Sequence, residues 1–286
     1  MNYSEKALTF DCGGETLVGV LSQPIRTTVS SRGVLIVVGG PQYRVGSHRQ
    51  FTLLARNLAE QGIAVLRFDY RGMGDSSGDR RAFDDLHDDI GSALDILFAQ
   101  LPFLRDAVIW GLCDAALAAL LYCNRDPRVT GLVAVNPDVR TIQVEARSYL
   151  KHYYVSRVFS RQLWQKISSG EFAVTKSIKS FATILRNSVA LRRERSDNAN
   201  TNESTLTVRI MREWERFDGR VLLLLSGDDL TAKAFSEMVS GSRRWQRLIG
   251  NQRCSRHDLP EANHTFSRRE WRDQVASLTA DWIRSW

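Results

Sequence analysis

Short runs of valine, isoleucine and leucine alternate with amphipathic helical stretches along most of the chain. Such runs are typical of strands buried on both faces, as in a parallel sheet with helices on each side. The predicted strands are Val34–Val38, Ile63–Phe68, Ala107–Trp110, Leu132–Asn136, Val221–Ser226 and Cys254–Leu259, with an antiparallel hairpin of Ala7–Phe10 and Thr16–Leu21 before them. We therefore expect an α/β fold with a mostly parallel, eight-stranded sheet.

Two of the intervening segments have a clear helical pattern. The first has one apolar face formed by Leu86, Ile90, Ala93, Leu94 and Leu97. The last helix is predicted to start at a capping box of Ser267 and Glu270. Its expected inward stripe is Trp271, Val275, Leu278 and Trp282.

Composition narrows the class of protein. The 286 residues include 43% apolar and 25% charged residues, the balance of an ordinary globular domain. No apolar run approaches the roughly 20 residues that a membrane span needs. The N-terminal sequence lacks the pattern of a secretory signal, so we expect a cytoplasmic protein.

The four cysteines form no C-x-x-C pair. We therefore expect free thiols and no metal or cofactor.

Residues 139–217 interrupt the alternation of strands and helices. They are mostly helical in pattern and contain a polar run at 196–204 that predicts a loop. We therefore expect residues 1–138 and 218–286 to form the core and 139–217 to form a helical lid over the site. The aromatic residues of the lid are suited to bury an acyl chain or a sugar.

The positive charge of the chain is concentrated in this insertion. From Val139 to Arg220 there are 16 lysines and arginines against 8 acidic residues, whereas the whole chain carries a net charge of +7. This surplus is either a solvated helical surface or a surface that faces an anionic substrate or partner. No nucleic-acid-binding motif accompanies it, so nucleic acid is the less favoured partner. The oligomeric state stays open.

The sharpest chemical signal is the sequence Trp-Gly-Leu-Cys-Asp-Ala at residues 110–115. It follows an apolar strand and precedes an apolar helix, which is the setting of a nucleophile elbow written G-x-C-x-A in place of G-x-S-x-G. A tight turn there needs small residues on either side of the nucleophile. The helix N-terminus favours a thiolate, so Cys113 is the candidate nucleophile, the alternative being a buried structural cysteine.

Partners for Cys113 follow in the order nucleophile, acid, histidine that is typical of α/β hydrolases. Asp228 and Asp229 follow the strand Val221–Ser226 after one glycine, Gly227, and His264 lies between the last strand and the last helix. In this arrangement His264 accepts the thiol proton and an aspartate orients the imidazole. Asp138, after the strand that ends at Asn136, is the third candidate for the acid.

A glycine turn after the first parallel strand provides the fourth part of the site. Gly39 and Gly40 are followed by Pro41, which has no N–H to donate. The oxyanion donors are therefore expected to be the backbone N–H of Gln42 or Tyr43 and the N–H of Asp114, the residue after the nucleophile. Arg44, His48 and Arg49 follow this turn and are candidates for binding an anionic group of the substrate.

The sequence Asp-Tyr-Arg-Gly-Met-Gly-Asp-Ser at residues 69–76 matches a D-x-R-G-x-G-x-S turn common in α/β hydrolases, and the whole chain resembles that superfamily. The segments GGPQYRVGSHRQF, FDYRGMGDSSG, WGLCDAA, LSGDDLTAKAF and ANHTFS resemble a narrower family, exosortase A system-associated hydrolase 1. The narrower resemblance implies a bacterial enzyme encoded with exopolysaccharide and protein-sorting systems, and it implies Asp229 as the acid, with Asp228 as the fallback.

The chain departs from the wider superfamily at three positions. Cys113 replaces serine, Gly39 replaces the usual histidine of the oxyanion turn, and Ala115 replaces glycine. The first change argues against ordinary esterase or lipase activity. We expect a hydrolase that cleaves a small-molecule or carrier-bound ester or thioester through an acyl-cysteine. The alternatives are an acyltransferase, a dienelactone-type hydrolase and a non-catalytic scaffold of the polysaccharide machinery.

Overall fold

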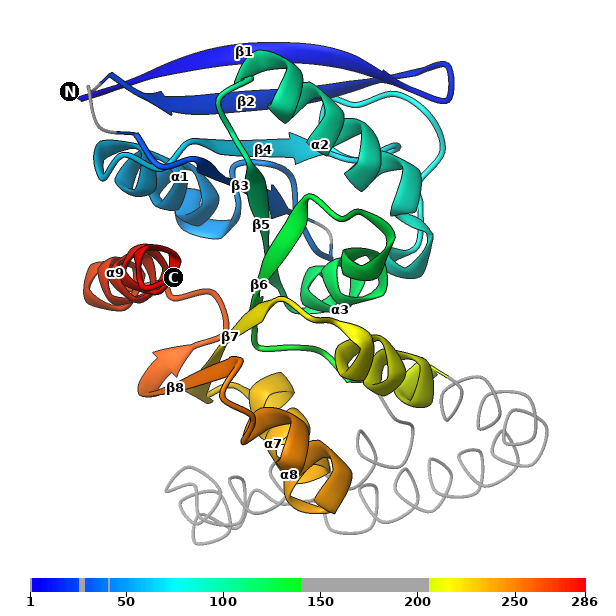
Figure 1. Ribbon diagram of the computed structural model, residues 1–286, viewed down its shortest axis with the longest axis vertical. Helices are drawn as coiled ribbons and strands as arrows, with labels where there is room; N and C mark the ends of the chain where they lie inside the picture. The colour runs from blue at the N-terminus through cyan, green and yellow to red at the C-terminus, as the bar shows by residue number, and fades with distance from the viewer. Residues whose placement is uncertain (1, 26–28, 41, 140–205) are drawn as a thin grey trace, which may run out of the picture. The chain divides into compact units, whose positions relative to one another are not determined.

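The computed structural model describes residues 2–25, 29–40, 42–139 and 206–286 (Figure 1). The chain divides into two compact units, Met1–Val139 with Ile210–Trp286, and Arg140–Arg209. The first unit holds the sheet. Most of the predicted lid, including its basic and aromatic surplus, lies outside the described residues.

The first unit contains an eight-stranded sheet in the order β1-β2-β4-β3-β5-β6-β7-β8. Strands β1 and β2 form the antiparallel hairpin, β2 pairs antiparallel with β4, and all later pairs are parallel. The strands are β1 (Tyr3–Cys12), β2 (Glu15–Pro24), β3 (Arg32–Val37), β4 (Val65–Asp69), β5 (Asp106–Leu112), β6 (Val129–Val135), β7 (Arg220–Asp228) and β8 (Cys254–Asn263). The predicted α/β sheet is confirmed.

Helices cover both faces of this sheet. Helices α1 (Gln50–Glu60) and α9 (Arg269–Arg284) contact each other on one face, and α2 (His87–Gln100) and α3 (Asp114–Tyr122) contact each other on the opposite face (Figure 1). Helices α7 (Leu230–Ser240) and α8 (Arg243–Ile249) pack together and contact β7 and β8. Short 3-10 turns lie at Ser47–Arg49, Phe83–Asp85 and Cys123–Arg125.

The predicted start of the last helix is wrong. Helix α9 begins at Arg269, and its N-cap residue, Arg268, makes no side-chain capping bond. Ser267 instead exchanges two hydrogen bonds with Asn263, so its hydroxyl is already used before the helix starts. The buried face of α9 is centred on Val275, Ala276, Thr279, Ala280 and Ile283, while Trp271 and Leu278 are half-buried at its edges.

The C-terminal end of the predicted insertion also differs. Residues 206–216 are helical, and from Ile210 onward they belong to the first unit. The ring of Trp214 lies 5.7 Å from that of Trp245 and 6.4 Å from that of Phe235. These aromatic contacts join residues 210–217 to α7 and α8, whereas the prediction extended the insertion to residue 217.

The turn after β4 is held by a buried ion pair and a serine. Arg71 donates from its backbone N–H and its guanidinium to Asp89 of α2, which is fully buried. Ser76 donates to the carbonyl of Asp69 at 2.6 Å and accepts from the N–H of Val18 on β2 at 2.9 Å. The arginine and serine of the D-x-R-G-x-G-x-S pattern therefore connect β4 to its neighbours.

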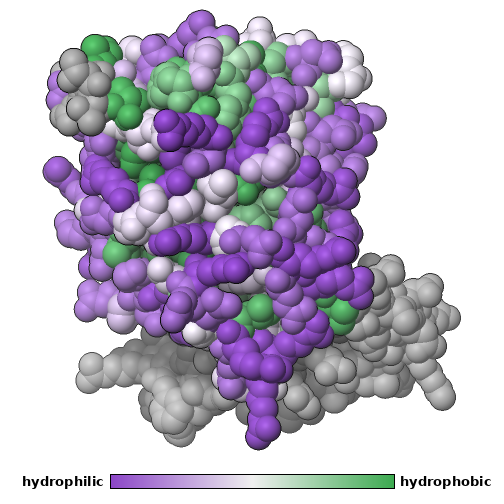
Figure 2. Space-filling view, viewed as in Figure 1, coloured by the Kyte–Doolittle hydropathy of each residue, from purple (hydrophilic) through white to green (hydrophobic). Residues whose placement is uncertain are grey.

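On the face of the described residues that Figure 2 shows, polar side chains predominate, with smaller apolar areas between them. In the described part of the chain, every helix is too short or too polar to cross a bilayer.

Candidate functional site

Cys113 lies at the sharp turn between β5 and α3. Its backbone has φ 64° and ψ −124°, a conformation that costs a non-glycine residue energy and is held by the surrounding structure. Its N–H donates to the carbonyl of Val135 at 2.9 Å, and its own carbonyl accepts from Ala116 and Asp138. The side chain is partly exposed, and the helix N-terminus beneath it favours negative charge on the sulfur.

The small residues around Cys113 are required by close packing. A Cβ added at Gly111 would lie 2.5 Å from the carbonyl oxygen of Ala115. Ala115 itself is fully buried where the strand and helix meet. The G-x-C-x-A pattern therefore reflects the narrow space between the end of β5 and the first turn of α3.

Asp229 and His264 are hydrogen-bonded to each other across two loops. Asp229 follows β7 and caps α7, accepting hydrogen bonds from the N–H groups of Thr231 and Ala232. Its carboxylate also lies 2.9 Å from Nδ1 of His264, which follows β8. Asp228, one residue earlier, is exposed.

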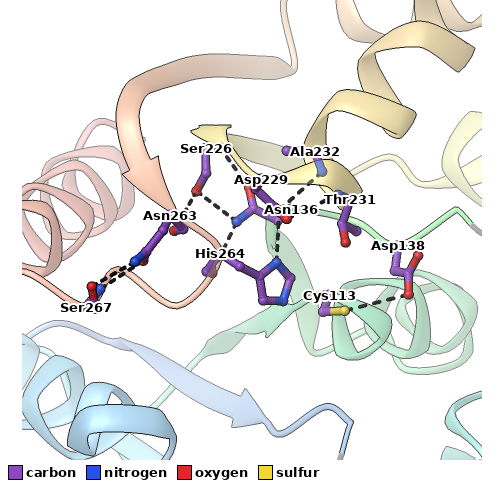
Figure 3. Close-up of polar contacts among 10 residues, drawn as sticks. All are labelled: Cys113, Asn136, Asp138, Ser226, Asp229, Thr231, Ala232, Asn263, His264 and Ser267. Carbon is purple, nitrogen blue, oxygen red and sulfur yellow. Dashed lines mark hydrogen bonds and ion pairs between the residues drawn. The ribbon is translucent and has the colours of Figure 1, made fainter. Parts of the chain in front are cut away.

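The environment of His264 favours its protonated form. The hydrogen bond to Asp229 raises the pKa of His264, and the charges of Asp229, Asp138 and Asp114 raise it further, while partial burial opposes the shift. In Figure 3 the imidazole lies between the Asp229 carboxylate and the sulfur of Cys113. With Nδ1 bound to Asp229, Nε2 is the nitrogen left to exchange a proton with a reacting group.

Asp138 lies beside Cys113. Its Oδ2 is 3.8 Å from Sγ of Cys113, on the side away from His264 in Figure 3. As the third candidate for the acid it was expected near the histidine. Its carboxylate contacts the thiol of Cys113, and its charge also raises the pKa of His264.

Asn136, which the sequence pattern predicts only as the end of a strand, joins the loops of the site. This fully buried residue pairs with Ser226 of β7 through two hydrogen bonds of 2.8 and 2.9 Å. It also donates to the carbonyl of His264 at 3.3 Å. Its φ of 44° is one that asparagine tolerates better than most residues. An asparagine ending an apolar strand was the available signal.

The glycine turn after β3 is attached to the N-terminus of α3 through Asp114. The carboxylate of Asp114 accepts from the N–H of Gly40 at 3.0 Å, so that N–H is not available to a substrate. A Cβ at Gly39 would lie 2.2 Å from Asp114 Oδ1, so only glycine allows this approach. The first N–H groups of a helix lack intrahelical partners, which leaves the N–H of Asp114 in a position typical of an oxyanion donor.

The two predicted loop donors differ in their surroundings. The N–H of Gln42 makes a long, 3.4 Å hydrogen bond to the carbonyl of Gly39, and its side-chain oxygen accepts from Ser47 and Gln50. The side chain of Tyr43 is 46% exposed. The turn therefore uses Gln42 to hold its own shape.

The three residues proposed to bind an anionic group differ in their surroundings. Arg44 forms ion pairs with Asp69 and Asp75, which neutralise its charge. His48 and Arg49 have positive φ angles and exposed side chains just before α1. Any anion bound by Arg44 would compete with two carboxylates.

Cys12 and Cys123 are buried, whereas Cys113 and Cys254 are both partly exposed. All four cysteines are free. Burial raises the pKa of Cys12 and Cys123, and it raises the pKa of Cys254 to about 12. In the described ranges no group of three or more His, Cys, Asp or Glu side chains is arranged to hold a metal ion.

Solved structures resemble this chain along nearly its whole length. The esterase Pf2001 of Pyrococcus furiosus covers 99% of this chain and 92% of its own, with a TM-score of 0.67 and 15% identity. Est1E of Butyrivibrio proteoclasticus, solved with ferulic acid bound, covers 97% and 98%, with a TM-score of 0.60 and 16% identity. XC6422 of Xanthomonas campestris, described as an α/β serine hydrolase without lid, covers 99% and 97%, with a TM-score of 0.57 and 16% identity.

At 15–16% sequence identity, the similarity to these structures shows a shared fold and nothing about activity. No curated protein matches the chain in sequence. Residues 30–267 do match a family, the one described as serine aminopeptidase, S33 (Hydrolase_4), and this match spans most of the sheet and includes Cys113, Asp229 and His264. The chain therefore belongs to this family of α/β-fold hydrolases.

Proposed function

We propose that this hydrolase cleaves an ester or thioester through a covalent acyl intermediate on Cys113, with His264 as the base and Asp229 as the acid of the triad. The observation that carries the proposal is a partly exposed cysteine at a strained turn before α3, in one site with a histidine bonded to a buried aspartate. A cysteine on such a turn would have little reason to adopt a positive φ if it were only a packing residue.

The first half of the reaction forms the acyl-enzyme. Nε2 of His264 takes the proton from the thiol of Cys113, and the sulfur attacks the carbonyl carbon of the substrate. Negative charge moves to the carbonyl oxygen, where the N–H of Asp114 and a donor from the oxyanion turn, Gln42 or Tyr43, stabilise it. Asp229 stabilises the imidazolium. Collapse of the intermediate breaks the bond to the leaving group, which takes the proton from His264.

The second half regenerates the enzyme. His264 removes a proton from water, and the hydroxide attacks the thioester carbonyl of the acyl-cysteine. The carbon–sulfur bond then breaks, the acid leaves, and the proton on His264 returns to the sulfur. An acceptor other than water at this step would make the same site an acyltransferase.

The names of two structural neighbours support an ester as the bond that is cleaved. Pf2001 is called an esterase, and Est1E was solved with the aromatic acid ferulic acid bound. The resemblance of the five sequence segments to exosortase A system-associated hydrolase 1 supports a finer proposal, that the enzyme acts in the cytoplasm of a bacterium as part of an exopolysaccharide system.

Trapping the intermediate tests the proposal. A panel of p-nitrophenyl esters and acyl thioesters is mixed with the full-length protein, quenched in acid and examined by intact-protein mass spectrometry. The expected result is an added acyl group on the peptide that contains Cys113, released by hydroxylamine. Cys254→Ala is the matched control and should keep the adduct, because the pKa of Cys254 is raised to about 12 by burial. Turnover without an adduct on Cys113 would refute the proposal.

The charge of the insertion predicts an anionic substrate, such as an acyl group on a phosphopantetheine carrier or a lipid-linked sugar phosphate. We expect kcat/KM for an acyl thioester of phosphopantetheine to fall as salt rises, because electrostatic attraction is screened over about 8 Å at physiological ionic strength. The kcat/KM for an uncharged ester of the same acyl group is the control and should stay constant. If kcat/KM depends on salt equally for the two substrates, the positive charge of the insertion does not attract the substrate and is only a solvated surface.

A further inference from the structure

A cavity of about 420 Å³ is lined by residues of α1 and α9. These two helices lie on the face of the sheet opposite α2 and α3 (Figure 1). This volume is within the roughly 300–1,000 Å³ of small-molecule sites. Apolar side chains from both helices and from the segment before α9 contribute to its wall: Phe51, Leu54, Phe266, Val275 and Ala276. None of Cys113, Asp229 and His264 is among the described residues that line it.

A buried hydrogen-bond donor in this wall has no partner. Trp110 of β5 lines the cavity, is 2% exposed, and packs edge-on against the ring of Phe51 at 5.7 Å. Within the described ranges its indole Nε1 donates to no protein atom. A buried donor left without an acceptor costs about 1–3 kcal/mol, so a ligand oxygen placed there would gain a hydrogen bond that no protein atom supplies.

The cavity also has a cation without a carboxylate partner. Arg56 and Arg269, which line it too, pair with Glu5 and Asp273. Half-buried Arg272 donates to the carbonyl of Ser267 at 2.8 Å, and in the described part of the chain it forms no ion pair. Arg272 is therefore the residue best placed to bind an anion at this cavity.

We propose that this cavity binds a small organic acid with an apolar body. Its carboxylate pairs with Arg272, an oxygen at its other end accepts from the indole of Trp110, and the body packs against Phe51, Phe266 and Ala276. A ring or short chain of this kind matches the combination of apolar wall, buried donor and unpaired cation.

This site shares two chain segments with the catalytic site while remaining separate from it. Trp110 precedes Cys113 by three residues on β5 and its turn, and Phe266 follows His264 by two residues. Phe266 has a φ of 50°, so its backbone is strained where the histidine loop turns toward α9. The acid therefore binds against the rear of the loops that carry the two reacting residues.

Three compounds of equal size test the two polar contacts by titration calorimetry with the full-length protein. They are 3-(4-methoxyphenyl)propanoate, its primary amide, and 3-(4-ethylphenyl)propanoate, which lacks the ether oxygen. We expect the methoxy acid to bind about five- to tenfold more tightly than either analogue, the effect of one hydrogen bond or ion pair. Arg272→Gln should remove the preference for acid over amide, and Trp110→Phe should remove the preference for methoxy over ethyl.

Controls separate this site from other surfaces. Arg247→Gln, at an exposed arginine of α8 that does not line the cavity, should leave both preferences intact. Protein alkylated at Cys113 should bind the methoxy acid as well as untreated protein does, whatever the outcome of the acyl-enzyme experiment. Failure of the wild-type protein to bind the methoxy acid would overturn the proposal. A preference for acid over amide that survives Arg272→Gln would also overturn it. Arg272 is half-buried and outside the apolar core, so this variant is expected to fold.

Discussion

Replacing Cys113 with alanine is expected to abolish hydrolysis while leaving the folded state intact. Alanine keeps the Cβ and the backbone hydrogen bonds to Val135 and Ala116 that form the turn. The loss of the nucleophile should lower kcat by about 10⁴-fold or more, as in other catalytic triads. Steady-state turnover of a p-nitrophenyl ester measures the loss, far-UV circular dichroism checks the fold, and Cys254→Ala is the active control.

Two further substitutions at Cys113 distinguish its chemistry from its backbone strain. Cys113→Ser should be strongly impaired yet more active than Cys113→Ala, because a hydroxyl needs more help from the base than a thiol does. Cys113→Gly should be inactive but more stable by about 1–2 kcal/mol, because glycine adopts a φ of 64° without the cost that other residues bear. Full turnover by Cys113→Ala on a substrate of the wild-type protein would remove Cys113 from the mechanism.

The sheet was predictable because its strands are continuous apolar runs bounded by turns. The run at Val221–Ser226, for example, corresponds to β7 with an error of one or two residues at each end. The proximity of Asp229 and His264 was also predictable, since both follow strands whose carboxyl ends lie at one edge of a parallel sheet. Order along the chain and the type of turn were sufficient for these features.

The features that the sequence did not predict depend on contacts between distant loops. Asn136 is linked to Ser226 and His264 over separations of 90 and 128 residues, and no local pattern encodes such a network. Ser267 and Glu270 have the spacing of a capping box, yet the hydroxyl of Ser267 accepts a hydrogen bond from the side chain of Asn263 and does not cap the helix. Asp138 reaches the sulfur of Cys113 because its own backbone N–H, in the turn after β6, donates to the carbonyl of Cys113.

Asp229→Asn is expected to lower kcat/KM by about 10²- to 10⁴-fold, because a neutral amide neither fixes the reactive tautomer of His264 nor stabilises the imidazolium. Asparagine is chosen because it is a good N-cap residue and can still accept from the N–H groups of Thr231 and Ala232. The loss of activity would then not arise from fraying of α7. Asp228→Asn, one residue away and exposed, is the matched control and should keep nearly full activity.

The pH profile gives this substitution a second readout that simple damage to the fold would not produce. His264 must be neutral to accept the thiol proton, so kcat/KM rises with pH through the pKa of this histidine. The hydrogen bond and charge of Asp229 hold that pKa above the usual value. Removing the charge lowers the pKa, and the acidic limb of the profile should therefore move to lower pH in Asp229→Asn.

Asp138→Asn should shift the acidic limb less, because Asp138 acts on His264 only through its charge. An acidic limb that stays in place in Asp229→Asn, or moves equally in Asp228→Asn, would show that Asp229 is not the acid of the triad.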